Sequence, residues 1–193
     1  MLNRMIPVIL IIVILVSFGF TQDKESAKEQ AKIILNSLNQ NNTIKDKIKE
    51  NCVIAVLYNP QSPLSENEKN LVVNSLDDNK KIKVHDKKIS VVEIPMDPSV
   101  NLEKKIIIKK INAFWLTSDL DHYINNIRES ARYNQVTTIS TNENMVTNSL
   151  VAMGIQKTEA GYKLVINKHE ASNINVDLNQ NLLSQSIASG IIL

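Results

Sequence analysis

Three short apolar runs, each followed by a segment with helical periodicity, constrain the fold of this chain most strongly. The runs cover residues 53–58, 113–117 and 136–140. The first is continuously apolar rather than alternating, as is typical of a parallel strand that is buried on both faces. Apolar residues at helical spacing follow over 65–77, 120–133 and 145–150. Strands that alternate with helices in this way predict a mainly parallel sheet with helices on both faces.

The remaining segments add elements at both ends of this pattern. Residues 24–39 carry apolar side chains at helical spacing, and a last helix is expected over 182–189. Residues 82–85 and 89–94 suggest two strands of a hairpin, whereas 102–110 fits a helix or a strand equally well. Two further strands, 151–157 and 162–167, flank the turn Glu159-Ala160-Gly161. The predicted fold is a single α/β domain with a mainly parallel sheet and an antiparallel closing hairpin.

The N-terminus has the pattern of a secretory signal peptide. Arg4 precedes an uncharged apolar run, and the small residues Ser17 and Gly19 fit a cleavage site before Phe20. We therefore expect a signal peptide over 1–19, with an uncleaved anchor as the alternative. Residues 20–50 would form the amphipathic helix and a polar linker, and residues 51–193 the α/β domain. The expected location is exported and periplasmic.

Charge and cysteine content exclude several classes of function. Without Arg4 the chain has 21 basic and 20 acidic residues, so no electrostatic footprint for nucleic acid or an anionic membrane is expected. We predict no direct membrane binding once the signal peptide is removed. Cys52 is the only cysteine, which excludes an intramolecular disulfide, and its place beside an apolar run predicts a buried thiol.

No catalytic, cofactor or metal motif stands out. Glycine-rich phosphate loops and a G-x-S-x-G serine are absent, and His85, His122 and His169 have no metal-ligand spacing. The Ser-x-x-acid patterns that begin at Ser65, Ser118 and Ser140 each follow a predicted strand. We interpret them as helix capping boxes, with Glu68 as the acidic partner of the first. The sequence therefore predicts no enzyme and no cofactor.

Candidate binding residues come from the loops at the carboxyl ends of the predicted strands. Ligands of open α/β sheets bind at this edge. The candidates for contact with a ligand or a partner are Tyr58, Asn59, Ser62, Asp97, Ser118 and Asn142. Trp115 is a candidate partner anchor if its side chain points to an outer face, although a place in the core is the ordinary expectation.

Several segments resemble the YfiR-like (YfiR/HmsC-like) family of small exported bacterial proteins. Residues 53–69 (VIAVLYNPQSPLSENEK) resemble its first strand, turn and helix, and INAFWLT, VTTIS and YKLVIN at 111–117, 136–140 and 162–167 are similar to its later strands. Asn134 and Asn173 stand where that family often has glycine, and its cysteine pair is absent. The resemblance implies a non-catalytic periplasmic regulator without a cofactor.

Three functions are consistent with these observations. The first is a regulator that binds the extracytoplasmic region of an inner-membrane diguanylate cyclase or sensor kinase, as in cyclic-di-GMP signalling, with homodimerisation left open. The second is a periplasmic solute-binding module of a transport system. The third is an exported enzyme with a dispersed active site. A large exposed apolar patch would favour the first, a pocket at the strand-end loops the second, and a buried, strongly pKa-shifted group the third.

Overall fold

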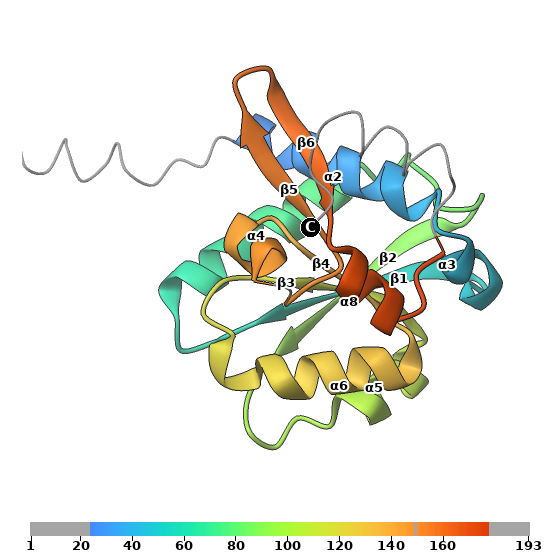
Figure 1. The fold of residues 1–193 in the computed structure, drawn as a ribbon, viewed down its shortest axis with the longest axis vertical. Coiled ribbons are helices and arrows are strands. Elements are labelled where there is room, and N and C mark those ends of the chain that lie inside the picture. Colours follow the sequence, from blue (N-terminus) through green and yellow to red (C-terminus); the bar gives the residue numbers. More distant parts are fainter. Residues whose placement is uncertain (1–23, 149, 178–193) are drawn as a thin grey trace, which may run out of the picture.

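A six-stranded sheet organises the computed structural model, which describes residues 24–148 and 150–177 (Figure 1). The strand order is β2-β1-β3-β4-β5-β6. The strands are β1 (Asn51–Tyr58), β2 (Lys88–Pro95), β3 (Ile111–Leu116), β4 (Thr137–Ser140), β5 (Met153–Thr158) and β6 (Gly161–Ile166). All neighbours pair in parallel except β5 and β6, which form an antiparallel hairpin. The predicted α/β fold class is confirmed.

Helices cover both faces of this sheet. They are α2 (Lys24–Leu38), α3 (Asn42–Lys47), α4 (Pro63–Asp78), α5 (Leu102–Lys109), the short 3-10 helix η1 (Asp121–Tyr123), α6 (Ile124–Asn134), α7 (Glu143–Thr147) and α8 (Lys168–Asn173). Helices α2 and α4 pack together on one side, and α5 and α6 lie side by side on the other (Figure 1). The ambiguous segment 102–110 is thus a helix, which begins at the side-chain cap of Asn101.

The predicted hairpin over 82–94 is wrong in its first strand. Only β2 is a strand, and the segment before it makes a single bridge between Val84 and Lys87. His85 and Asp86 between them have φ values of 49° and 64°. This left-handed two-residue turn is closed by hydrogen bonds between Val84 and Lys87 in both directions, and the chain enters β2 directly after it, without a preceding strand that pairs along β2.

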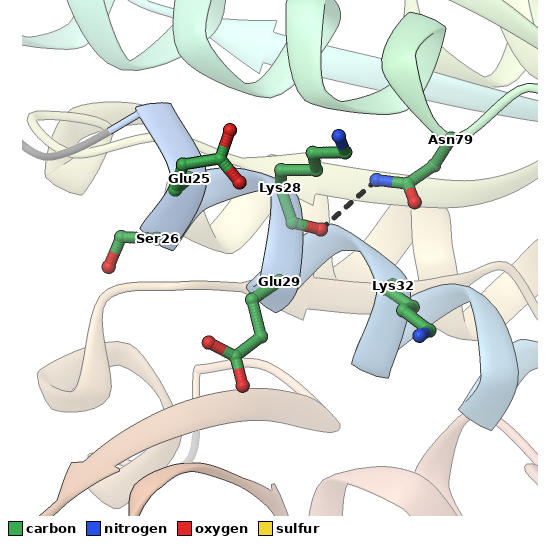
Figure 2. A pocket seen from close by; sticks show the side chains of 6 residues that line it. All are labelled: Glu25, Ser26, Lys28, Glu29, Lys32 and Asn79. Carbon is green, nitrogen blue, oxygen red and sulfur yellow. Dashed lines mark hydrogen bonds between the residues drawn. The ribbon is translucent and has the colours of Figure 1, made fainter.

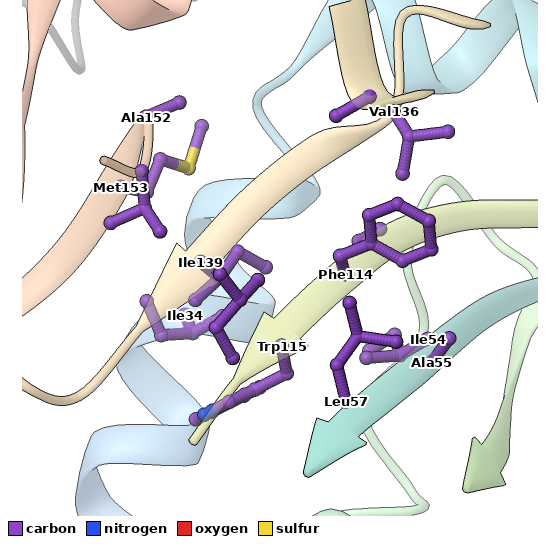
Figure 3. Packing of buried hydrophobic residues seen from close by; sticks show 14 of the residues in the cluster. Ile34, Ile54, Ala55, Leu57, Phe114, Trp115, Val136, Ile139, Ala152 and Met153 are labelled. Carbon is purple, nitrogen blue, oxygen red and sulfur yellow. The ribbon is translucent and has the colours of Figure 1, made fainter. Parts of the chain in front are cut away.

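The core is built where the two helical layers meet the sheet. Phe114 and Trp115 are adjacent on β3 and therefore point to opposite faces, yet both are buried (Figure 3). Helix α2 contributes Ile34 and Leu35 to the same cluster, as its helical spacing predicts. Each such side chain contributes about 1.5–3 kcal/mol by leaving water.

Cys52 lies in this core, as predicted. Its side chain is fully buried at the start of β1, and burial raises the pKa of the thiol to about 12. A thiol with so high a pKa is unreactive at neutral pH.

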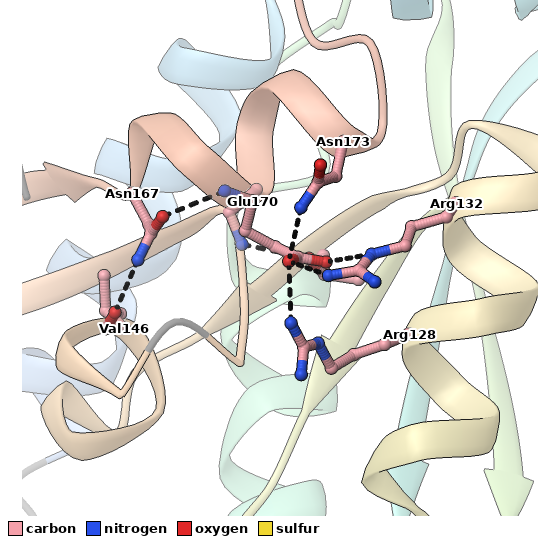
Figure 4. Close-up of polar contacts among 8 residues, drawn as sticks. Arg128, Arg132, Val146, Asn167, Glu170 and Asn173 are labelled. Carbon is pink, nitrogen blue, oxygen red and sulfur yellow. Dashed lines mark hydrogen bonds and ion pairs between the residues drawn. The ribbon is translucent and has the colours of Figure 1, made fainter.

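An ion-pair network ties the last described helix to the domain (Figure 4). The carboxylate of Glu170 on α8 is fully buried and lies 2.7 Å from Nη2 of Arg132 and 3.1 Å from Nη2 of Arg128, both on α6. Asn173 donates a further hydrogen bond to it, of 3.4 Å. Asn167 caps α8 through the Glu170 amide and also donates to the carbonyl of Val146.

Two predicted segments lie outside the described residues, namely the signal peptide over 1–19 and the helix over 182–189. Within residues 24–148 and 150–177, no helix has the length and apolar character that crossing a membrane requires.

Candidate functional site

The loops that follow β1, β3 and β4 meet at one edge of the sheet and are joined there by side-chain hydrogen bonds. Ser65, Ser118 and Ser140, all predicted to cap helices, lie at this edge, but none of them is a helix cap. The capping residues are Ser62 for α4 and Asn142 for α7, while the helix after Ser118 has no side-chain cap. The three serines instead bond to neighbouring strands and loops and, in the case of Ser118, to helix α4.

Asn59 and Ser62 connect the loop after β1 to the loop after β3. The Asn59 side-chain amide donates to the carbonyl oxygen of Asp119 over 3.1 Å, and the Ser62 hydroxyl donates to the Asp119 carboxylate. The Ser62 oxygen also accepts the amide N–H of Ser65 at 3.2 Å, which caps α4. Asp119 has φ of 59°, an uncommon left-handed conformation for a residue other than glycine.

Ser65 and Thr117 form the buried floor beneath these contacts. The Ser65 oxygen accepts the amide N–H of Asn59 at 2.8 Å and lies 2.6 Å from the Thr117 hydroxyl oxygen. Thr117 donates to the carbonyl of Leu57 at 3.0 Å. The Ser65 side chain therefore joins the end of β1 to the end of β3, because it bonds to residues that follow both strands. The polar side-chain atoms of Ser65 and Thr117 all have hydrogen-bond partners.

Ser118 is the centre of a second group, which reaches helix α4. Its amide N–H donates to Oε2 of Glu68 at 2.5 Å, and its hydroxyl donates to Oε1 of the same carboxylate at 2.8 Å. The side-chain amide of Asn142 donates to the Ser118 hydroxyl oxygen at 3.2 Å. No ion pair to Glu68 occurs among the residues described, so neutral donors alone hold its charge.

Ser140 and Gly154 position Asn142. The Ser140 hydroxyl donates to the Leu116 carbonyl at 3.0 Å, and its oxygen accepts the Asn142 amide N–H at 3.1 Å. A Cβ added to Gly154 would lie 2.1 Å from Cγ2 of Val146 and 2.8 Å from the Ser140 carbonyl oxygen. Glycine at this position is what lets α7 lie directly on β5.

Tyr58 lies beside this edge, and the ammonium group of a lysine lies over its half-buried ring. The Lys69 ammonium lies 4.8 Å from the ring centroid of Tyr58 and pairs with Glu93 at 3.2 Å. Lys69 thereby links β1 to the neighbouring edge strand β2.

Asp97 does not join the other candidates. It lies beyond the end of β2, where its carboxylate accepts the amide N–H of Ser99 at 2.8 Å and the Ser99 hydroxyl at 2.5 Å. These bonds lower the pKa of Asp97. The residue borders an open hollow of about 510 Å³ along α5, whose lining includes Ser99, Lys105 and Ile108. Of the six loop candidates, Asn59, Ser62, Ser118 and Asn142 share hydrogen-bonded groups, Tyr58 lies beside them, and Asp97 is separate.

Trp115 is not a surface anchor, because its side chain does not point to an outer face, and its expected place in the core is confirmed. Its side chain is only 1% exposed, because helices cover the sheet on both faces. Its indole nitrogen Nε1 is buried without a hydrogen-bond partner, near the end of β3 (Figure 3). Trp115 lines a cavity of about 10 Å³ together with Glu68, Gln30 and Thr141, which is about the space of one water molecule.

Other surfaces give less support for a binding site. A hollow of about 490 Å³ runs along the outer face of α2 and is lined by Glu25, Lys28 and Asn79 among others (Figure 2). Its one drawn contact is the Asn79 amide donating to the Lys28 carbonyl at 3.0 Å. In the part of the chain that the structure describes, no group of three His, Cys, Asp or Glu side chains is arranged for a metal ion.

Sequence reasoning missed two members of the edge. In the capping-box interpretation, Asp119 is only an intervening residue of the pattern that begins at Ser118, and Glu68 is only the partner of Ser65. The available signal was Pro63, since proline favours the first turn of a helix. It places the start of α4 directly after Ser62, and so leaves Ser65 and Glu68 free for other contacts.

Comparison with known proteins yields structures but no sequence family. No family model matches the chain, and no curated protein matches it. The fold is similar to the ABC domain in complex with L-Trp from Streptococcus pneumoniae, with 13% identity and a TM-score of 0.59 over 87% of this chain and 62% of that one.

A second similar structure is the ligand-free, open form of a substrate-binding protein with adhesive properties from Clostridium difficile. The identity is 14% and the TM-score 0.50, over 72% of this chain and 55% of that one. This chain thus matches little more than half the length of either protein. Identities this low show a shared fold, and the resemblance to the YfiR-like family stays a prediction.

Proposed function

We propose that this chain is a non-catalytic, exported solute-binding module whose binding surface is the carboxyl edge formed by the loops after β1, β3 and β4. The observation that carries the proposal is the polar group at this edge. Ser118 is its centre, with Asn142 and Glu68 on either side and Asn59 and Ser62 next to it. Three loops that are distant in sequence place donors and acceptors at one point, as ligand sites in open α/β sheets do.

The similarity to substrate-binding proteins supports this proposal over the regulator predicted first. One neighbour is described with L-Trp bound, and the other is described as a substrate-binding protein. Because this chain matches only 62% and 55% of those chains, we propose that its edge supplies one wall of a binding site. A solute would then lie on the edge itself, since the enclosed cavity there has room for about one water molecule.

Binding to a panel of solutes tests the proposal. The full-length chain is mixed with amino acids, small carboxylates, sugars and polyamines, and its thermal unfolding is followed. A true ligand stabilises the folded state by about 2.7 kcal/mol at 100 times its Kd. Ser118→Ala should weaken binding at least tenfold, whereas Ser172→Ala on the exposed side of α8 should not change it. A panel without any stabilising solute contradicts the proposal.

A second candidate, the regulator of a membrane signalling protein, is supported by a different surface. Ile107 and Ile108 on α5 are 71% and 61% exposed, and Tyr133 on the neighbouring α6 is 82% exposed. Exposed apolar side chains on adjacent helices are typical of protein contacts. Co-purification from host membranes tests this candidate, with Ile107→Asp expected to abolish recovery of the partner and Glu159→Gln to leave it intact. If both variants recover the same proteins, this surface is not the docking site.

A further inference from the structure

The carboxylate of Glu68 occupies donors that would otherwise serve a ligand at the proposed edge. The Ser118 amide N–H and hydroxyl each bond to one oxygen of Glu68, at 2.5 and 2.8 Å. Two donors from one residue that meet both oxygens of a carboxylate form a small anion site. Neutral hydrogen bonds to a carboxylate can be taken over by another carboxylate, since no fixed cation must be re-paired.

A second, independent observation lies directly beside this contact. The indole N–H of Trp115 is buried and unpartnered, and Trp115 lines the same small cavity as Glu68. A buried donor without an acceptor is costly, and native structures rarely leave one in place without a reason. Thr141, from the loop that also carries Asn142, lines the same cavity.

Resting on the solute-binding function proposed above, we infer that the solute bears a carboxylate group and that Glu68 is its internal substitute. On binding, the solute carboxylate accepts the amide N–H and the hydroxyl of Ser118. Glu68, which is half-buried and held by no ion pair among the described residues, then turns toward the cavity and accepts the Trp115 indole N–H. No covalent bond changes, and the number of satisfied donors rises by one.

This exchange assigns a selectivity to the site. A neutral amide of the same shape offers one acceptor oxygen and one NH2 group. That NH2 group could only donate to the Ser118 oxygen, which already accepts the Asn142 amide, and it would leave the Ser118 hydroxyl proton without an acceptor. Such a compound cannot replace both oxygens of Glu68. The site should therefore distinguish a carboxylate from its amide, a difference that a merely polar surface would not produce.

Acetate and acetamide are the probes that test the inference. Each is titrated into the full-length wild type, Glu68→Ala and the control Glu66→Ala, at constant ionic strength set with sodium chloride. Glu66 is an exposed carboxylate on the same helix. The readouts are the amide NMR signal of Ser118 and the fluorescence of Trp115, which is the only tryptophan.

We expect acetate to bind Glu68→Ala at least tenfold more tightly than the wild type, because its competitor is gone. Acetamide should bind neither protein detectably, and Glu66→Ala should match the wild type. In the wild type, acetate should shift the Trp115 signal together with that of Ser118. In Glu68→Ala the Trp115 shift should vanish, since no carboxylate remains to move.

Other outcomes overturn the inference in distinguishable ways. Equal binding of acetate and acetamide, or equal gains in Glu68→Ala and Glu66→Ala, contradicts the exchange. If the solute panel finds a neutral ligand at the edge while acetate does not bind, the solute-binding function stands and the carboxylate inference fails. If neither acetate nor any panel solute binds wild type or Glu68→Ala, both fail. Should Glu68→Ala not fold, Glu68→Gln serves in its place, with the same order of affinities expected.

Discussion

Two carboxylates, Glu170 on α8 and Glu68 on α4, show how differently this domain treats an acidic side chain. Glu170 is fully buried and is held by two arginine side chains that are 23% and 36% exposed. Glu68 is half-buried and is held by the hydroxyl and amide of one serine. If a carboxylate between two cations moves away, the cations are left without a counter-charge. A carboxylate that is held only by neutral donors can be replaced by another carboxylate without this cost. Glu170 therefore stabilises the fold, whereas Glu68 belongs to the edge that we propose as the binding surface.

The largest effect should come from Glu170→Gln, which removes the charge that Arg128 and Arg132 share. Breaking a buried ion pair from one side costs about 3–5 kcal/mol. We expect the low end, about 3 kcal/mol, because both arginines keep some contact with water. Unfolding in denaturant measures it, with Glu159→Gln in the β5–β6 turn as the matched control. A loss below about 1 kcal/mol would mean that α8 is not fastened by this pair.

The second prediction concerns how the stability that Glu170 contributes depends on pH. Burial on its own would raise the pKa of Glu170, but the hydrogen bonds from Arg132 and Arg128 outweigh it, and the pKa lies below its usual range. Since the folded-state pKa is the lower one, this stability is present above the unfolded pKa and is lost as pH falls through the folded pKa. Unfolding of the wild type from pH 7 to pH 3 should show the loss below about pH 4.3. In Glu170→Gln the curve should be flatter there, and an unchanged slope would contradict the assignment.

Gly154→Ala should disturb the proposed binding edge while leaving Glu170 in place. The added Cβ would lie 2.1 Å from Val146 Cγ2 and 2.8 Å from the backbone oxygen of Ser140. Overpacking of this kind costs about 1–3 kcal/mol. Addition of Val146→Ala removes the nearer contact and should restore part of the stability. An effect within about 0.5 kcal/mol would show that α7 shifts freely on β5.

The smallest effect on stability should come from Ser118→Ala. It removes the hydroxyl bonds to Glu68 and Asn142, but half-buried Glu68 regains water, so we expect a loss of about 1 kcal/mol. Ser172→Ala is the control, and chemical denaturation measures both. A loss near that of Glu170→Gln would make Ser118 a structural residue and would erase the contrast between the two carboxylates.

The fold could be predicted from the sequence to a large extent because hydrophobic periodicity reflects which faces are buried. The apolar spacing of α2 and the continuous apolar run of β1 each have one consistent explanation in a covered parallel sheet. The closing hairpin was predicted from its glycine turn, and Gly161 does adopt φ of 121°. The prediction of a strand before β2 failed because a left-handed turn at His85 and Asp86 has no strong local signal in the sequence.

The site could be predicted only in outline. The strand order brings the loops of Asn59, Ser118 and Asn142 together, so their proximity follows from the topology alone. Their partners could not be deduced, because Ser-x-x-Glu fits a capping box as well as it fits a long-range contact such as Glu68 with Ser118. The burial of Trp115 follows from helices on both faces of β3, which the alternation of strands and helices in the sequence predicts.

An amide NMR titration of the full-length chain with a mixture of amino acids and acetate tests most directly whether the carboxyl edge binds a solute. We expect shifts of the Ser118 and Asn142 amides together with the single indole signal of Trp115, while the signals of α5 stay in place. Shifts confined to the α5 surface around Ile107 and Ile108, or no shifts at all, would contradict the claim that the carboxyl edge is the binding surface.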